Sequence, residues 1–290
     1  MNTRTPPRIL AIAGSDSSGG AGIQADIKTI TMLGGYAMTA ITAITAQNTV
    51  GVAAVAHCEG SMVLKQIAAC VEDIGVDAIK IGMLGNEEIV RNVSAALVAA
   101  PEISARSAQA LARHPRPPGV RRFPIVVDPV MVATSGALLI DEAAIGSMRA
   151  RLFPLATLIT PNLPELEVLC PGSLVTIDDI RNAALQLARE TGAHVLAKGG
   201  HGHGDAIIDL LVAPDGETLT FESPRIATRH THGTGCTLSS AIATLVGHGQ
   251  PLGEAVRLGR EFVLRAIRAA PGFGAGNGPL GHQAVRDAQT

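Results

Sequence analysis

A glycine-rich turn followed by a cysteine stands near the C-terminus, in the stretch HTHGTGCTLSSAIATLVGH at residues 230–248. From Thr237 onward the apolar residues recur at helical spacing, which predicts a buried helix. Gly233 and Gly235 let the backbone approach a ligand closely, and the first amides of a helix attract anions. The pattern favours a phosphate site, although such turns also occur without a ligand. The helix start predicts a lowered pKa and thiolate character for Cys236, against the alternative of a small buried residue.

Acidic, amide and basic side chains follow three other predicted strands. Asn162 and Glu165 stand three residues apart around the start of a helix, and Asp128 ends the segment FPIVVD. Carboxylate and amide oxygens suit Mg²⁺, which keeps several waters and is usually shared with substrate phosphates. The alternative for Asn162 and Glu165 is that they only cap the helix. Lys198, at the end of HVLAK, is expected to reach a nucleotide phosphate, the alternative being a solvated lysine.

Several other motifs point away from common ligands. The chain contains no G-x-x-x-x-G-K-[ST] phosphate loop. Its G-x-G-x-x-G pattern at residues 276–281 follows no predicted strand and contains a proline, which disfavours a dinucleotide-dependent dehydrogenase. The pairs His201/His203 and His230/His232 have no third ligand at a typical spacing, which disfavours zinc. His232, beside the glycine turn, remains a candidate for orienting a phosphate.

The composition narrows the class of protein. The chain of 290 residues is 47% hydrophobic but only 2% aromatic, so its core must be built from Ala, Val, Ile and Leu, as in parallel strands buried on both faces. A formal charge of −2 provides no basic field for nucleic acid, and no run approaches the roughly 18 apolar residues of a membrane span. The N-terminal apolar run is too short for a secretory signal. The 4 cysteines, without a C-x-x-C pair, predict reduced thiols in the cytoplasm.

Predicted strands and helices alternate along the chain. Strands are expected at residues 8–14, 36–46, 77–82, 123–130, 155–160 and 194–200, helices at 22–34, 61–75, 86–100, 141–153 and 176–192, then a hairpin at 206–223 and two closing helices. This order predicts an α/β fold with a doubly wound, mostly parallel sheet in three α/β/α layers. The loops after the strands should then meet at one site. Residues 1–290 are expected to form a single domain, with a proline- and arginine-rich surface insertion at 100–122 rather than a basic binding arm.

The segments that stand out occur in the order and at about the spacing of a known family. GSDSSGGAGIQADIKT, TAITAQNTVGV, KIGML, VVDPVMVATSG, LITPNLPE and THGTGCTLSSAIA resemble bacterial hydroxymethylpyrimidine/phosphomethylpyrimidine kinases of the ribokinase-like superfamily. The resemblance runs from about Ile9 to the final helices and is broken mainly at 100–122. It implies an ATP- and Mg²⁺-dependent kinase of thiamine biosynthesis. Such an enzyme phosphorylates 4-amino-5-hydroxymethyl-2-methylpyrimidine and then converts the monophosphate to the diphosphate.

The resemblance also implies roles for individual residues. The positions matching the pyrimidine pocket are Gly14, Asp26, Gln47, Met83 and Val130. The positions expected at the nucleotide are Lys198, Thr234, Asn162 and Glu165, with Asp128 and Glu165 expected at Mg²⁺. Gly233, Gly235 and the following amides would stabilise the transferring phosphoryl group. Cys236 would stand where many superfamily relatives have an aspartate base.

Two alternatives remain open from the sequence. A pyridoxine or pyridoxal kinase of the same superfamily shares the G-T-G-C loop, and a non-catalytic sensor would bind a pyrimidine or nucleotide without turnover. The expected partners are a small-molecule substrate and ATP, with no nucleic acid and no membrane. A homo-oligomer, a dimer, is also expected.

Overall fold

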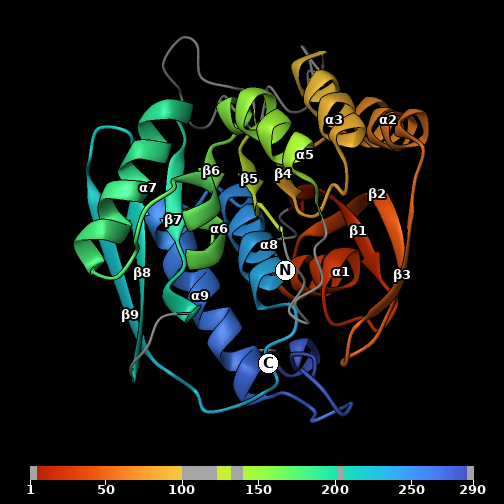
Figure 1. Ribbon diagram of the computed structural model, residues 1–290. Coiled ribbons are helices and arrows are strands. Elements are labelled where there is room, and N and C mark those ends of the chain that lie inside the picture. The colour runs from red at the N-terminus through yellow and green to blue at the C-terminus, as the bar shows by residue number, and fades with distance from the viewer. Residues whose placement is uncertain (1–4, 100–122, 132–139, 202–204, 286–290) are drawn as a thin grey trace.

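The computed structural model describes residues 5–99, 123–131, 140–201 and 205–285 (Figure 1). Within them one sheet of nine strands has the order β3-β2-β1-β4-β5-β6-β7-β8-β9. The strands are β1 (Arg8–Asp16), β2 (Tyr36–Gln47), β3 (Val52–His57), β4 (Ala78–Ile81), β5 (Ile125–Val127), β6 (Leu158–Ile159), β7 (His194–Ala197), β8 (Ala206–Val212) and β9 (Thr218–Pro224). The predicted insertion at 100–122 lies outside the described residues.

The sheet is mostly parallel, as predicted. Six strands pair with one another in parallel, in the order β2, β1, β4, β5, β6 and β7. The β8–β9 hairpin adds two antiparallel strands at one edge. At the other edge β3 pairs antiparallel with β2. The sequence pattern did not predict β3, because its residues are mostly exposed and show no buried–exposed alternation.

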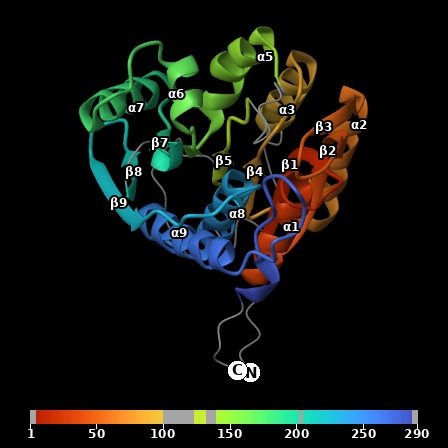
Figure 2. The same cartoon turned by 60° about the horizontal axis from the view of Figure 1, so that its bottom comes forward.

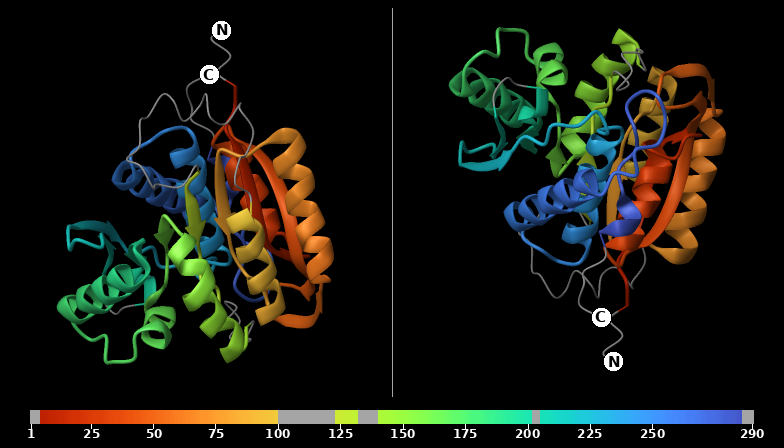
Figure 3. Two further views of the ribbon diagram at one scale, coloured as in Figure 1. Left: turned by 90° about the horizontal axis from the view of Figure 1, so that it is seen from above. Right: turned by 90° about the horizontal axis from the view of Figure 1, so that it is seen from below.

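Helices cover both faces of the sheet. One face carries α1 (Gly22–Met32), α8 (Thr234–Gly247) and α9 (Leu252–Arg268), and the other carries α2 (Gly60–Ala69), α3 (Glu87–Ala99), α5 (Glu142–Ser147), α6 (Leu163–Leu169) and α7 (Ile177–Thr191) (Figure 2). Figure 3 shows the same layers end-on, with α1, α8 and α9 side by side. The described part of the chain also has short helical turns at Cys70–Ile74, Met148–Leu152, Phe153–Leu155, Gly199–His201 and His282–Ala284. The predicted three-layer α/β/α fold is confirmed.

The core is divided between the two faces. In β1, Leu10 and Ile12 pack with the helices of one layer, whereas Ile9, Ala11 and Ala13 pack with α1 and α8 in the other. Side chains of a strand alternate between faces, so a strand covered on both sides must be apolar throughout. This explains the unbroken apolar run at the start of the chain. No helix of the described residues is long and apolar enough to cross a bilayer.

The parallel strands deliver polar side chains to a single edge of the sheet. Asp16 and Gln47 end β1 and β2, and Asp128, Asn162 and Lys198 follow β5, β6 and β7. Because parallel strands point the same way, these residues converge at the carboxyl edge, as the loop pattern predicted.

A buried ion pair joins the sheet to two helices of one layer. Lys80 of β4 places Nζ 2.8 and 2.9 Å from the two carboxylate oxygens of Asp26 in α1. The Ser240 hydroxyl of α8 donates a 2.7 Å hydrogen bond to Asp26 Oδ1, and the side chains of Lys80 and Asp26 are both 0% exposed. Burial alone lowers the pKa of Lys80, but the adjacent Asp26 carboxylate raises it above its ordinary value. Burial raises the pKa of the Asp26 carboxyl, and the adjacent Lys80 ammonium opposes that rise. The contacts of Lys80 Nζ with both carboxylate oxygens favour the ionised pair.

We expect Lys80→Met to lower the free energy of unfolding by about 3–5 kcal/mol, because it leaves the Asp26 carboxylate buried without its partner. Lys80→Met combined with Asp26→Leu should recover most of this loss. Urea unfolding measures both variants. Arg257→Met is the control, since its pairs with Glu254 and Glu261 are exposed to solvent and should contribute little to stability. Equal losses for Lys80→Met and Arg257→Met would contradict the prediction.

Candidate active site

A cavity of about 850 Å³ opens at the carboxyl edge of the sheet. The loops after β1, β4, β5, β6 and β7, the end of β2, the β8–β9 hairpin and the first turn of α8 all contribute to it. Its position is the one that the parallel strand order predicts for a ligand site.

The start of α8 forms the inner wall of the cavity. The N-cap residue, Gly233, adopts φ 86° and ψ 9°, and no side chain caps the helix. Gly233 through Cys236 line the cavity, and the first amides of a helix have no intrahelical acceptor. A Cβ atom on Gly233 would lie 1.9 Å from the carbonyl oxygen of Gly20, so only glycine permits this approach of the two loops. The predicted anion-binding helix start is thus built into the cavity wall.

An ion pair lies directly against this helix start. Lys198 Nζ donates a 2.8 Å hydrogen bond to Asp128 Oδ1, which also accepts a 3.1 Å bond from Thr160 Oγ1. A Cβ atom on Gly235 would lie 3.1 Å from Asp128 Oδ2 and 3.4 Å from Lys198 Nζ. Lys198 is therefore not a solvated lysine, and its ammonium group stands beside the helix start where an anion would bind.

Asn162 and Glu165 form a reciprocal cap on α6. The Glu165 amide donates 2.9 Å to Asn162 Oδ1, and the Asn162 amide donates 2.8 Å to Glu165 Oε2. The capping alternative is thus confirmed, yet both residues also line the cavity. Burial raises the pKa of the Glu165 carboxyl to about 7, with Lys198 opposing the rise and Asp128 adding to it. Among the described residues, no group of three or more His, Cys, Asp and Glu side chains gathers at one point.

Cys236 departs from the prediction of a thiolate. Burial raises the pKa of its thiol to about 11, with Lys80 opposing and the Asp26 and Asp128 carboxylates adding to the rise. The predicted lowering is wrong, because a sequence pattern shows the helix start but neither the burial of the thiol nor the two carboxylates behind it. Cys236 still borders the cavity through its partly exposed side chain.

The residues expected to bind the pyrimidine separate into two groups. Gly14, Gln47, Met83 and Val130 line the cavity. A Cβ atom on Gly14 would lie 2.4 Å from Met83 Cε, so this glycine makes room for the methionine. Asp26 does not line the cavity, since its carboxylate is fully buried and paired with Lys80 and Ser240. Its role at the pyrimidine therefore stays a prediction.

Asp16 and His232 form a junction that the sequence analysis did not predict. Asp16 accepts hydrogen bonds from Ser18, Gly20, Ala21 and His232, the last at 2.8 Å from Nε2. An ionised carboxylate only accepts, so Nε2 carries the histidine proton. Burial would raise the pKa of Asp16, but these donors, His232 foremost, lower it to about 2. The signal in the sequence was an Asp at a strand end before Ser-Ser-Gly-Gly, a turn-forming pattern.

The outer part of the cavity has an apolar wall and a second buried pair. Ile226, Val263 and Ile267 line it from the loop after β9 and from α9. Beside them, Arg260 Nε donates 2.7 Å to Asp209 Oδ2, and Asp209 Oδ1 accepts 2.7 Å from the Gly199 amide next to Lys198. Sequence reasoning missed this region because its residues come from three segments without a shared motif.

Comparison with known proteins identifies a family. The phosphomethylpyrimidine kinase family model matches residues 16–111 and 103–281. A hydroxymethylpyrimidine/phosphomethylpyrimidine kinase from Haemophilus influenzae is 39% identical, over 96% of this chain and 97% of that protein. A thiamine biosynthesis bifunctional protein from Geobacter sulfurreducens is 44% identical over 97% of this chain, which spans about half (54%) of that protein. The structure of an ADP complex of Bacillus subtilis pyridoxal kinase superposes with a TM-score of 0.83 at 32% identity, covering 98% of this chain and 100% of that one.

The lowered pKa of Asp16 predicts a loss of stability in acid. A carboxyl whose folded pKa, about 2, lies below its unfolded value of 3.8 stabilises the fold above pH 3.8 and loses that contribution as the pH falls toward 2. Between pH 5 and pH 3, wild-type protein should lose about 1 kcal/mol more unfolding free energy than Asp16→Asn. Urea midpoints at the two pH values test this. Equal losses in the two proteins would show that the carboxylate is not held by these donors.

Proposed function

The chain belongs to the phosphomethylpyrimidine kinase family, and we propose that it transfers the γ-phosphoryl group of ATP twice in thiamine biosynthesis. The first acceptor is the hydroxymethyl oxygen of 4-amino-5-hydroxymethyl-2-methylpyrimidine, and the second is the phosphate of the resulting monophosphate. The observation that carries the proposal is that Gln47 and the uncapped start of α8 line the same cavity. Such a cavity would bring an aromatic heterocycle and a phosphate chain together.

The nucleotide is assigned to the side of the cavity formed by α8 and α9. The amides from Gly233 to Gly235, with Thr234 between them, and the ammonium of Lys198 would hold its phosphates. The apolar wall of Ile226 and Val263 suits a purine base. The similar pyridoxal kinase was solved as an ADP complex, which supports a nucleotide on this fold.

The donor set of the cavity fits Mg²⁺. Asp128 and Glu165 both line it, and Asp128 Oδ2 is directed toward Gly235. Mg²⁺ is typically held by one or two carboxylates together with waters and phosphate oxygens, and it neutralises the charge that develops during transfer. Asn162 would act on this site indirectly, by fixing Glu165 through the α6 cap.

The acceptor is assigned to the side formed by the ends of β1, β2 and β4. The Gln47 amide offers both a donor and an acceptor to an aminopyrimidine edge, and Gly14, Met83 and Val130 complete the pocket around the ring. The acceptor hydroxyl would then face the α8 start. For the first transfer the Cys236 thiol would first lose its own proton. The acceptor oxygen would then bond to the γ-phosphorus, the bond from that phosphorus to the departing ADP would break, and the hydroxyl proton would pass to the Cys236 thiolate.

A pyridoxal kinase activity is the second candidate, favoured by the TM-score of 0.83 with the Bacillus subtilis enzyme. Its identity of 32% is lower than the 39% and 44% of the pyrimidine-pathway relatives, which favours the pyrimidine. The cytoplasmic location and the homodimer remain predictions.

Purified protein incubated with Mg-ATP is expected to convert the hydroxymethylpyrimidine to its mono- and diphosphate, identified by mass. Pyridoxal and pyridoxine, supplied separately, should react more slowly in kcat/KM. Faster turnover of pyridoxal would favour the second candidate. Binding of the pyrimidine or nucleotide without any product would favour the sensor alternative.

We expect Cys236→Ala to slow the first transfer more than the second, by about 10²-fold or more. The acceptor of the first step is a hydroxyl that must lose its proton, whereas the phosphate acceptor of the second step is already ionised at neutral pH. Single-turnover rates with each acceptor measure the difference. Equal losses in the two steps would refute a role of Cys236 as proton acceptor.

The pH dependence provides the control for this assignment. With the thiol pKa raised to about 11, the thiolate fraction increases roughly tenfold per pH unit between pH 7 and pH 9. The ratio of first- to second-transfer rates should rise accordingly in wild-type protein and stay flat in Cys236→Ala. Taking the ratio cancels the titration of Glu165, which affects both steps. A flat ratio in the wild type would exclude the thiolate as the base.

A further inference from the structure

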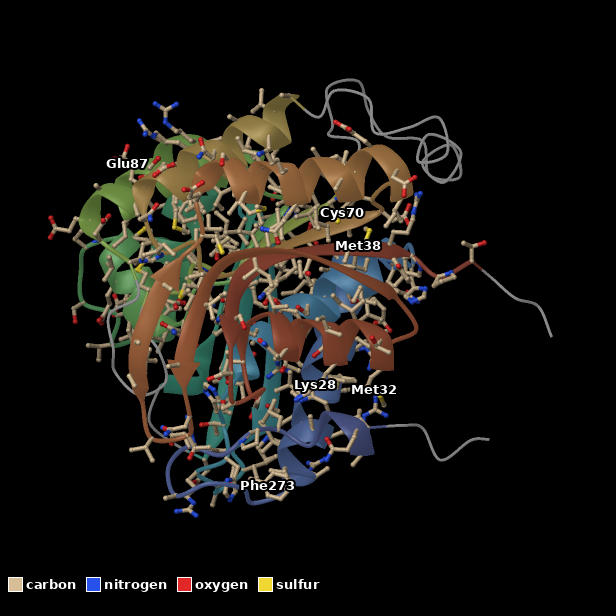
Figure 4. All side chains as sticks on the ribbon, turned by 90° about the vertical axis from the view of Figure 1, so that its right-hand side faces the viewer. Lys28, Met32, Met38, Cys70, Glu87 and Phe273 are labelled. Carbon is tan, nitrogen blue, oxygen red and sulfur yellow. The ribbon has the colours of Figure 1, made fainter. Side chains whose placement is uncertain are left out.

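The G-x-G-x-x-G pattern at residues 276–281 has a structural role that no nucleotide motif explains. After α9 the chain runs beneath α1 and the ends of β2 and β3, in the segment marked by Phe273 (Figure 4). We call residues Gly274–His282 the C-terminal strap. It contacts the turn after β2, the loop that leads into α8 and the first turn of α8.

The first contact is with the turn between β2 and β3. A Cβ atom on Gly276 would lie 2.1 Å from the Thr49 carbonyl oxygen, and one on Gly274 would lie 2.2 Å from Thr49 Oγ1. The Asn277 amide donates 2.9 Å to that same carbonyl oxygen. Since Thr49 stands two residues after Gln47, the strap fixes the end of the strand that carries Gln47.

The second contact is with the loop that leads into α8. The His232 amide donates 3.1 Å to the Gly278 carbonyl oxygen, and a Cβ atom on Gly278 would lie 2.1 Å from His230 Nδ1. His232 in turn holds Asp16 through its ring, with Gln47 Nε2 at 3.5 Å from the same ring nitrogen. The strap therefore reaches both the pyrimidine side and the phosphate side of the cavity.

The third contact reaches the first turn of α8. His282 Nε2 and Thr237 Oγ1 share a 2.8 Å hydrogen bond, and the two residues are 2% and 0% exposed. Burial lowers the pKa of His282 to about 4, so this bond joins neutral groups at neutral pH. Thr237 directly follows Cys236, and Gly281, next to His282, is anchored by its amide on the Ala266 carbonyl oxygen.

We propose that the C-terminal strap is a positioning element that holds the Gln47 wall and the start of α8 at a fixed separation, through Gly276 on Thr49 and His282 on Thr237. None of these four residues lines the cavity among those the structure describes, so the strap acts through other residues. The changes in kcat and KM predicted below rest on the proposed kinase function. Fixed separation matters because phosphoryl transfer requires the acceptor and the phosphate chain to be aligned.

Gly276→Ala and Gly272→Ala form a matched pair for the test. The Gly276 backbone is not left-handed, so an added methyl group acts by pushing against the backbone of Thr49 and Val50. Gly272 has φ +76° and nothing within 4 Å of an added Cβ, so its alanine variant reports backbone strain without a contact. Gly276→Ala should raise KM for the pyrimidine about fivefold or more with kcat within about twofold, while Gly272→Ala leaves both within about twofold. Thr49→Val, which only removes the weak 3.3 Å bond from the Gly276 amide, is the milder variant if Gly276→Ala does not fold.

His282→Leu tests the other end of the strap. It should lower kcat about tenfold with KM for the pyrimidine unchanged, and His282→Gln, which can restore a donor and acceptor to Thr237, should recover part of the loss. Thermal unfolding of all variants separates simple destabilisation from these kinetic changes. Equal KM for Gly276→Ala and Gly272→Ala, or wild-type kcat in His282→Leu, would overturn the proposal.

Binding of a non-hydrolysable ATP analogue, measured by calorimetry, separates this proposal from the proposed function. If wild-type protein phosphorylates no pyrimidine, the kinase proposal fails. The affinity for the ATP analogue then tests the strap by itself. The Kd of the analogue should rise at least about threefold in His282→Leu but not in Gly272→Ala. Unchanged affinity in both variants would overturn the strap as well.

Discussion

The site depends on a helix start whose amides are left without a side-chain cap. Gly233 is the N-cap residue of α8 and has a left-handed backbone conformation. A larger residue would not fit there, because the Gly20 carbonyl oxygen occupies the space of a Cβ atom. α6 and α7 show the contrasting solution, since capping boxes at Asn162 and Thr176 satisfy their first amides internally. α8 therefore lacks a side-chain cap, whose usual contribution is on the order of 1 kcal/mol, and its start lines the cavity, with the Thr234 amide donating 3.3 Å to the Thr231 carbonyl oxygen.

Paired charges join the elements that lie around the cavity. Asp128 with Lys198, Asp26 with Lys80, Asp209 with Arg260 and Asp16 with His232 each join different elements across the carboxyl edge. A buried charge without a partner is costly, so each pair also fixes the relative position of the elements it joins. A phosphate that takes the Lys198 ammonium would free Asp128 Oδ1 for a cation. The ion pair between Asp128 and Lys198 could thus be exchanged for contacts of the two side chains with ligands.

The sequence predicted what local patterns and strand order determine. Alternating strands and helices predicted the layers, and the loops after the strands placed Gln47, Asp128, Asn162 and Lys198 at one edge. β3 was missed because pairing with β2, rather than burial, holds it. Position within a motif could not show that Asp26 pairs with Lys80 away from the cavity, nor that burial, with two carboxylates adding to its effect, raises the pKa of Cys236. These outcomes depend on which segments become neighbours in three dimensions.

The glycines of the C-terminal strap also show what the sequence alone does not predict. A run of closely spaced glycines predicts that a backbone passes very near something, since only glycine lacks the Cβ atom that would collide. At Gly233 the neighbour is the Gly20 carbonyl oxygen of another loop, and a helix without a side-chain cap begins there. At Gly276 the neighbour is the Thr49 carbonyl oxygen, and no helix start follows directly. Glycine thus permits a close approach of two backbones in both segments, and only in the first does a long helix begin at the glycine.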